Sequence, residues 1–237
     1  MADLRRFFVD KIEDTVNVSD EEFRHAINVL RIKEGDDIIL CDNSGYEYFA
    51  KVDKINKKDF IASVYDKKFS KTETQEDVIL ICGYLKGDKT ELVVQKATEL
   101  GVKKIVVFSS EFSSAYINDN KLSRLNKVAV EASKQCKRAI APSVEYAKDL
   151  ESALGFASDY KNKFFACEFA DETEVDLKNI DGSTAIVVGS EGGFSQNEFE
   201  LAKSLEFKTV YLGKRILRAE TCSIILTALV MSGLGEL

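Results

Sequence analysis

The stretch from Ile186 to Leu229 decides the fold, and it reads IVVGSEGGFSQNEFELAKSLEFKTVYLGKRILRAETCSIILTAL. It opens with a β-branched apolar run that stops at Gly189, the pattern of a strand buried on both faces of a parallel sheet. A second apolar run, residues 209–212, stops in the same way at Gly213. Each run therefore predicts a buried strand that ends in a glycine loop.

A helix should follow each of these loops. Ser195 precedes Glu198 by three residues, which is a capping box, and Phe194 and Phe199 are placed to form a hydrophobic staple around it. We expect a helix over residues 196–205 and a last helix, apolar nearly all round, after the basic turn that follows Gly213. Open α/β sheets form ligand crevices where strands end in such loops, so a small-molecule site is the default hypothesis.

The first loop, GSEGG, carries neither the dinucleotide fingerprint nor a phosphate-binding P-loop. A plain strand-to-helix turn is the alternative interpretation of so short a motif. An enzyme of ordinary doubly wound topology that uses a dinucleotide is therefore disfavoured, although the motif alone does not exclude it.

Composition sets outer limits on the function. The chain has 237 residues, 45% of them hydrophobic, enough for one large core or two modest ones. The net charge of -7 requires any RNA contact to be a local basic patch. Five cysteines without a C-x-x-C pair are typical of a reducing cytosol, and we see no signal peptide or membrane span, so we expect a cytoplasmic protein. A single histidine, His25, argues against a metal site.

The pattern changes about a third of the way along the chain. A capping box at Ser19 and Glu22 predicts a short helix, and three short strands are expected at residues 37–41, 46–52 and 60–65, which suggests a small barrel. Residues 66–77 are polar without apolar periodicity, as a linker would be. From residue 78 strands alternate with helices, with a strand expected over residues 78–84, a helix over 89–100 and a strand over 104–108, which predicts a parallel sheet. We therefore expect two domains, residues 1–73 and 74–237.

The helix expected over residues 122–138 has two distinct faces. An apolar stripe includes Leu125 and Ala129, while the opposite side carries Arg124, Glu131, Gln135 and Arg138. Six Lys or Arg and one Glu fall between Lys121 and Pro142, a basic patch in an acidic chain. A solvated helix face is the plain interpretation, and a contact with RNA is the functional one.

Five motifs together resemble the bacterial 16S ribosomal RNA uridine N3-methyltransferases, the small-subunit methyltransferase E family of the SPOUT class. The motifs are GSEGGFS, LGKRILRAET, KGDKTELVVQKATELGV, RHAINVLR and EASKQCKR, and the resemblance covers essentially the whole chain. It implies an α/β fold: a C-terminal SPOUT-type parallel sheet with a deep trefoil knot, preceded by a small PUA-like β-barrel domain. The chain departs from the family pattern at Phe112, Ser190 and Ala219, where the family usually has Arg, Pro and Thr.

The resemblance also implies a reaction, methyl transfer from S-adenosylmethionine to N3 of a specific uridine. That nitrogen lies on the Watson–Crick edge and carries a proton, so the base must be unpaired, the proton removed, and the charge on O2 and O4 stabilised. We expect Arg218 and Arg138 to be the donors and Glu191, or alternatively Glu220, to be the base. The residues expected at the cofactor are Cys167, Gly189, Ser190, Glu191, Gly192, Gly193, Leu212, Gly213, Ile216, Leu217, Arg218 and Thr221.

The expected partners are 16S ribosomal RNA, in the assembled small subunit, and a second copy of the chain, because the last helix is apolar around most of its circumference. Guanidinium groups fit phosphate bidentately, which favours arginines as RNA contacts. The expected RNA-binding residues are Arg5, Arg6, Arg24, Arg31, Arg124, Gln135 and Arg138. A non-catalytic RNA-binding protein with the same fold, or a methyltransferase of another RNA nucleotide, stays open from sequence.

Overall fold

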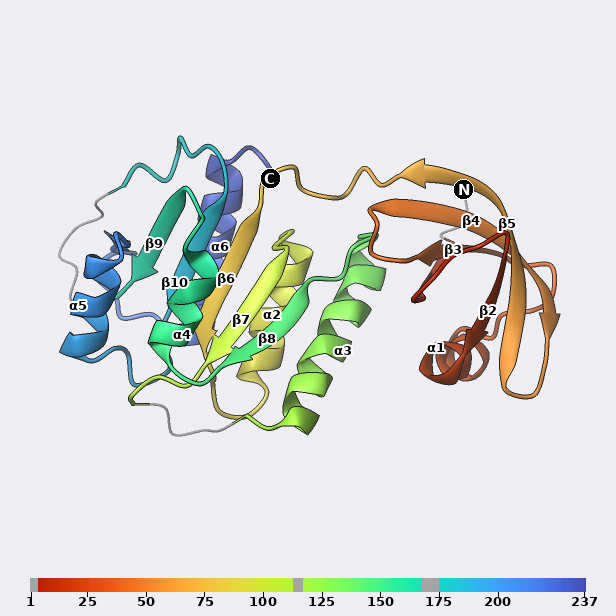
Figure 1. Cartoon of the computed structure of the whole chain (residues 1–237), viewed down its shortest axis with the longest axis horizontal. Helices are drawn as coiled ribbons and strands as arrows, with labels where there is room; N and C mark the ends of the chain where they lie inside the picture. The colour runs from red at the N-terminus through yellow and green to blue at the C-terminus, as the bar shows by residue number, and fades with distance from the viewer. Residues whose placement is uncertain (1–3, 113–116, 168–174) are drawn as a thin grey trace. The chain divides into compact units, whose positions relative to one another are not determined.

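The computed structural model describes residues 4–112, 117–167 and 175–237 (Figure 1). The chain divides into two compact units. The N-terminal unit comprises Met1–Glu73 together with Ser133–Ala141, and the C-terminal unit comprises Thr74–Ala132 together with Pro142–Leu237. A short segment from the middle of the chain thus belongs to the N-terminal unit, which the sequence pattern did not indicate.

The N-terminal unit is built on a curled five-stranded sheet with the strand order β1-β3-β4-β5-β2 (Figure 1). Its pairs are antiparallel except for β1 with β3. Register shifts between β4 and β5 bend the hairpin, as bulges do. Phe7, Val18 and Phe60 are buried in the core that the sheet encloses. The strands are β1 (Arg5–Phe8), β2 (Thr15–Ser19), β3 (Asp37–Cys41), β4 (Tyr46–Ile55) and β5 (Asp59–Phe69).

Several local expectations for this unit need correction. β5 continues to Phe69, so residues 66–69 form a strand rather than the start of a linker, because backbone pairing with β4 holds them whatever their polarity. The sequence did not indicate β1 or β2. The capping box at Ser19 is absent: the Ser19 hydroxyl donates to Asp20, which has a left-handed φ of 56°. Only a six-residue helix, α1 (Asp20–His25), follows, and it continues as the π-helical segment Ala26–Leu30.

Helix α3 (Asp119–Cys136) ends two residues earlier than the sequence predicts. Lys137 adopts a left-handed φ of 68°, and the Arg138 amide donates to the Ser133 carbonyl at 2.9 Å. This is the hydrogen-bond pattern of a Schellman motif, which reverses the chain at a helix end. Arg138 therefore does not share the exposed helix face with Gln135, and it is only 2% exposed.

The guanidinium of Arg138 lies against the carboxylate of Glu73. Nε and Nη2 of Arg138 donate to one carboxylate oxygen at 3.2 and 3.1 Å, and the amides of Ala139 and Ile140 donate to the other at 2.7 and 2.9 Å. The Glu73 side chain is 4% exposed. All of these residues belong to the N-terminal unit, so Glu73 fastens residues 138–140 to it.

The C-terminal unit is a six-stranded, wholly parallel sheet in the order β11-β9-β10-β6-β7-β8 (Figure 1). Every residue of β6 and β10, the two central strands, is buried, as their apolar runs predict. The strands are β6 (Val78–Gly83), β7 (Lys104–Phe108), β8 (Ser143–Ala147), β9 (Asn162–Ala166), β10 (Thr184–Val188) and β11 (Lys208–Val210).

Helices cover both faces of this sheet. One core joins alternate strand residues such as Leu80 and Ile186 to side chains of α2, α3 and α6. The other joins Ile81 and Val187 to side chains of α4 and α5. The remaining helices are α2 (Lys89–Glu99), α4 (Leu150–Leu154) with the 3-10 turn Gly155–Ala157, α5 (Gln196–Ser204) and α6 (Ala219–Gly233). The sequence reading anticipated α2, α5 and α6 but not β8 or α4.

The strand order reverses direction within this unit. The chain runs from β6 outward to β7 and β8, and then crosses to β9 on the other side before β10 fills the gap beside β6. The loops after β6, β10 and β9 consequently leave the same edge of the sheet from neighbouring strands, the place where open parallel sheets bind ligands. The knot expected in this unit stays a prediction, because residues 168–174, between β9 and β10, lie outside the described residues.

The ion pair of Glu73 generates a prediction about stability. Glu73→Ala leaves the buried guanidinium of Arg138 without its carboxylate, and breaking a buried pair in this way costs about 3–5 kcal/mol. Glu13→Ala is the matched control, because Glu13 pairs with Lys11 on the surface, where the two side chains are 64% and 79% exposed. Urea unfolding followed by circular dichroism should show a large loss for the first variant and an unchanged midpoint for the second. Equal midpoints would contradict a structural role for Glu73.

Candidate functional site

The turn after β10 is the best-packed part of the predicted site. Ser190 accepts a hydrogen bond from the Gly193 amide at 3.0 Å, and Gly193 has a left-handed φ of 67°, which glycine tolerates. The turn presses against the end of β6: a Cβ on Gly83 would stand 2.4 Å from the Ser190 nitrogen. The Ser190 hydroxyl also meets the Ser110 hydroxyl, after β7, at 2.8 Å. These contacts fix the turn to two neighbouring strands.

Glu198 holds the same turn from the other side. It completes the capping box of α5: its backbone amide donates to the Ser195 hydroxyl, and its carboxylate accepts from the Ser195 amide at 2.9 Å. Its second oxygen accepts from the Glu111 amide at 3.0 Å. The sequence indicated the cap but gave no sign that this carboxylate also anchors the loop after β7.

Glu191 points from the turn to the loop after β6. Its carboxylate accepts from the Lys89 ammonium and from the Lys86 amide, both at 3.1 Å. Partial burial raises the pKa of Glu191, but the hydrogen bonds from Lys89 and Lys86 outweigh it, and the pKa is lowered overall. The group is therefore ionised at neutral pH and a weak proton acceptor, which disfavours the role of general base that the sequence suggested for it.

The loop after β11 is open by contrast. Gly213 has a φ of 97° with free space where a Cβ would be, and Ile216 is 97% exposed. The Arg218 side chain is 78% exposed, and its Nη1 lies 4.0 Å from a carboxylate oxygen of Glu220. Glu220 itself is nearly buried at the start of α6, and within the described part of the chain its other oxygen has no hydrogen-bond partner.

The structure brings the predicted cofactor residues to one edge of the sheet. Cys167 follows β9, the five residues from Gly189 to Gly193 follow β10, and the others follow β11. Because β9 lies between β10 and β11, all three segments leave neighbouring strands on the same side. Phe112, at a departure from the family pattern, packs on this turn: a Cβ on Gly192 would meet the Phe112 Cβ at 2.7 Å.

The predicted RNA-binding residues divide into exposed and buried ones. Arg6 is 7% exposed and pairs with Glu47, and Arg138 is buried against Glu73. Both guanidinium groups are thus engaged with glutamates of their own unit, which argues against RNA contacts by either and against Arg138 as a catalytic donor, and the two assignments stay predictions. The exposed residues are Arg5, Arg24, Arg31, Arg124 and Gln135, and Arg124 makes an ion pair with Glu91 at 2.7 Å.

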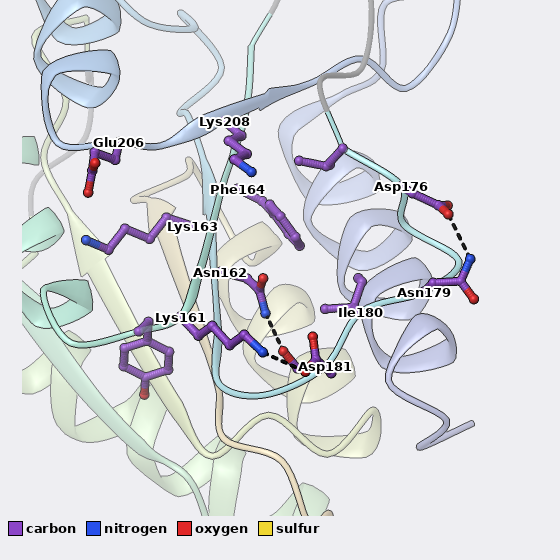
Figure 2. Close-up of a pocket in the computed structure, with 12 residues that line it drawn as sticks. Lys161, Asn162, Lys163, Phe164, Asp176, Asn179, Ile180, Asp181, Glu206 and Lys208 are labelled. Atoms are coloured by element: carbon purple, nitrogen blue, oxygen red, sulfur yellow. Dashed lines mark hydrogen bonds and ion pairs between the residues drawn. The ribbon is translucent and has the colours of Figure 1, made fainter.

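A cavity of about 470 Å³ lies elsewhere in the C-terminal unit (Figure 2). It is lined by the first residues of β9 and β11, including Asn162 and Lys208, and thus stands at the opposite strand ends from the predicted cofactor loops. Figure 2 shows that some of its polar groups pair with one another: the Lys161 ammonium with Asp181 at 2.6 Å, and the Asn179 amide with Asp176 at 2.7 Å. Because of its position and these internal pairs, we do not place the functional site in this cavity.

The described residues contain no group of three or more His, Cys, Asp or Glu placed to hold a metal ion. No helix among them is both long enough and apolar enough to cross a membrane.

Comparison with known proteins decides the family. A family model of an RNA methyltransferase domain matches residues 72–231, and one of an RNA methyltransferase PUA domain matches residues 18–65. Ribosomal RNA small subunit methyltransferase E of Bacillus subtilis (strain 168) is 30% identical, over 93% of both chains. The chain belongs to the ribosomal RNA small subunit methyltransferase E family. The resemblance drawn from the motifs is thus confirmed.

Other members agree in sequence and in structure. The protein of the same name from Mesomycoplasma hyopneumoniae (strain 232) is 29% identical over 93% of this chain and 96% of its own. The Neisseria gonorrhoeae member, whose crystal structure is bound to S-adenosyl methionine, is 26% identical in sequence. The two structures superpose over 98% of both chains with a TM-score of 0.87. The expected α/β fold, a C-terminal parallel sheet preceded in the sequence by a PUA-like domain, is confirmed, and the chain is an RNA methyltransferase.

The close approach of β6 to the β10 turn can be tested by substitution. Gly83→Ala would force the Ser190 backbone away, and overpacking of this kind costs about 1–3 kcal/mol. We expect a lower melting temperature and at least about tenfold weaker binding of S-adenosylmethionine by calorimetry, at roughly 1.4 kcal/mol per factor of ten. Gly155→Ala, where a Cβ meets nothing within 4 Å and φ is -57°, is the control. Cofactor binding unchanged in both variants would separate the turn from the cofactor site.

Proposed function

We propose that this chain methylates N3 of a specific uridine in 16S ribosomal RNA of the small subunit, with S-adenosylmethionine as the methyl donor. The observation that carries the proposal is that the carboxyl ends of the neighbouring strands β9, β10 and β11 lie at one edge of the sheet in a chain of this family. Small-subunit ribosomal RNA is the substrate that the relatives' names state. S-adenosyl methionine is the molecule bound in the related Neisseria structure.

The residues at this edge fit such a cofactor. Gly189, Gly192 and Gly213 permit close backbone approach, and the partly buried Leu212 and Leu217 offer apolar contact for an adenine ring. When bound, the cofactor supplies an activated methyl group on a sulfonium. Ser190, Gly193, Ile216, Thr221 and Cys167 would complete the walls of the site. Glu191, held by Lys89, would keep the β10 turn against the loop after β6.

The arginine of the last loop is the group best placed to act on the base. The side chain of Arg218 is mostly exposed, so its guanidinium is able to meet the uracil oxygens where negative charge develops after loss of the N3 proton. Glu220, 4.0 Å away and nearly buried, would orient that guanidinium. The uridine must be unpaired or flipped out, since N3 is otherwise engaged in base pairing.

The RNA itself would be held by local groups, because the chain is acidic overall. Arg5, Arg24 and Arg31 are exposed on the N-terminal unit, and Arg124 and Gln135 are exposed on α3. We propose that the PUA-like unit contributes RNA grip while the cofactor is held by the C-terminal unit. The enzyme would act in the cytoplasm, on the assembled subunit.

The proposed reaction can be measured directly. Small subunits from cells that lack this methylation are incubated with the protein and isotopically labelled S-adenosylmethionine, and their nucleosides are separated by mass spectrometry. We expect labelled 3-methyluridine from 16S ribosomal RNA, and more of it from assembled subunits than from naked RNA. A different labelled nucleoside, or cofactor binding without any product, would refute the proposal.

Arg218→Ala should lower the rate of methyl transfer far more than cofactor affinity. Losing one preorganised donor to a developing charge typically costs about 10²-fold to 10³-fold in turnover. Arg218→Lys should restore only part of the rate, because an ammonium lacks the planar fork of a guanidinium. Single-turnover kinetics at saturating cofactor and RNA isolate the chemical step.

Arg215→Ala is the matched control for Arg218→Ala, since Arg215 is an exposed arginine of the same loop. It should leave the chemical step nearly unchanged. If Arg218→Ala instead lowers the melting temperature and leaves the chemical step intact, Arg218 is a structural residue.

We also propose a homodimer that uses α6. Ile225 and Leu229 are 39% and 41% exposed on this helix, and Leu229 lines a hollow of about 410 Å³ together with Leu177 and Gly233. Large apolar side chains that share one surface with a hollow are typical of an interface between subunits.

Light scattering at micromolar concentration should give twice the mass of the chain, and Leu229→Asp should give a monomer. Leu205→Asp is the control: Leu205 is 40% exposed at the end of α5, outside the proposed interface, and the dimer should persist. A monomeric mass for the unaltered protein would disprove the dimer.

A further inference from the structure

Exposed aromatic side chains gather where β4 begins and β5 ends, apart from the RNA contacts assigned above. Tyr46 is 38% exposed and Phe69 63% exposed, and the two stand opposite each other in the strand register. Their rings meet edge to face with centroids 5.4 Å apart, and the Tyr48 ring lies 6.4 Å from that of Tyr46. We call Tyr46, Tyr48 and Phe69 the aromatic platform. Several solvent-exposed aromatic side chains in contact with one another are typical of a binding surface.

A lysine stands at the platform. Lys67 is the cross-strand partner of Tyr48, and its ammonium lies 5.4 Å from the centroid of the Tyr46 ring. The nearby carboxylates have other cations: Glu47 pairs with Arg6, and Asp66 pairs with Lys68. Among the described residues no carboxylate forms an ion pair with Lys67, so its charge is available to a ligand that meets the rings.

The hairpin as a whole is positive in a negative protein. Residues 46–69 carry six lysines (51, 54, 57, 58, 67 and 68) against four acidic residues (47, 53, 59 and 66), whereas the chain has a net charge of -7. Since attraction of a polyanion must come from local charge in such a protein, this hairpin is a suitable place for it.

We infer that the aromatic platform binds single-stranded RNA, with unpaired bases stacked on Tyr46 and Phe69 and a phosphate beside Lys67. Every base has a face that stacks on an aromatic ring, and a basic groove beside such rings is the common design for single strands. Duplex RNA presents phosphates but keeps its base faces covered. An acidic peptide presents carboxylates but has no bases that would stack on the exposed aromatic rings. The inference rests on the proposed function for its RNA and adds where unpaired nucleotides of that RNA would lie on the N-terminal unit.

The test uses the full-length protein and a fluorescein-labelled octauridylate, with binding followed by anisotropy. Tyr46→Ala and Phe69→Ala should each weaken binding by about tenfold to a hundredfold, the usual effect of removing a stacking ring. Tyr46→Phe keeps the ring and should bind almost as well as the unaltered protein. Lys67→Ala should reduce the salt dependence by about one phosphate contact.

Two controls separate stacking from general effects. Tyr65→Ala removes a 59% exposed tyrosine of the same strand that lies outside the platform, and it should bind the octauridylate normally. An eight-base-pair RNA duplex should bind the unaltered protein and the two ring variants alike. Melting temperature and S-adenosylmethionine affinity should not change, and if Tyr46→Ala is unstable, Phe69→Ala decides because that ring is the more exposed.

Unchanged octauridylate binding in Phe69→Ala, or an equal loss on the duplex, overturns the inference. If Phe69→Ala still binds the octauridylate but no longer binds a partner protein, the platform is a site for that protein and the inference is overturned. A different result would refute the proposed function: the unaltered protein would make no 3-methyluridine on small subunits. If it does make the product, and Phe69→Ala does so with the same KM, only the platform is refuted.

Discussion

The pairing of β6 with β10 at the centre of the parallel sheet is the constraint on which the site depends. Both strands are wholly buried, and the register that aligns Cys82 with Val188 brings Gly83 against Ser190. A side chain at residue 83 would collide with backbone, so the turn after β10 has its place only because β6 ends in glycine. The contacts of Ser190 with Ser110, and of Glu191 with Lys89, then follow from that position.

Much of the C-terminal unit could be predicted from sequence because its signals are local. The apolar runs at β6, β7 and β10 and the capping box at Ser195 are properties of adjacent residues, and each predicted element is present. The residues predicted at the cofactor do follow strands, but that these strands are neighbours depends on the strand order, which no local pattern contains, and their role at the cofactor stays a prediction. The role of Glu198 at Glu111 was missed for the same reason, since 87 residues separate the two.

The N-terminal unit shows where local reasoning fails. Its strands β1 and β2 are short and half polar, and β5 carries Asp66, Lys67 and Lys68 as strand residues, so only pairing with neighbours makes them strands. The sequence predicts Arg6 and Arg138 to be surface cations because arginine usually is one. Each is buried by a glutamate distant in sequence, Glu47 or Glu73, and no periodicity marks such a pair.

These buried pairs change how the charge of the protein should be understood. Arginines that neutralise Glu47 and Glu73 contribute nothing to attraction of RNA, so a count of basic residues overstates the basic surface. The exposed cations include Arg5, Arg24, Arg31, Arg124 and the lysines of the β4–β5 hairpin, but the net charge of the chain is -7. Exposed charges are screened beyond about 8 Å at physiological salt, so only cations close to a phosphate attract RNA. Contacts that do not depend on charge, such as the base stacking inferred for the aromatic platform, would let an acidic methyltransferase distinguish its RNA from other polyanions.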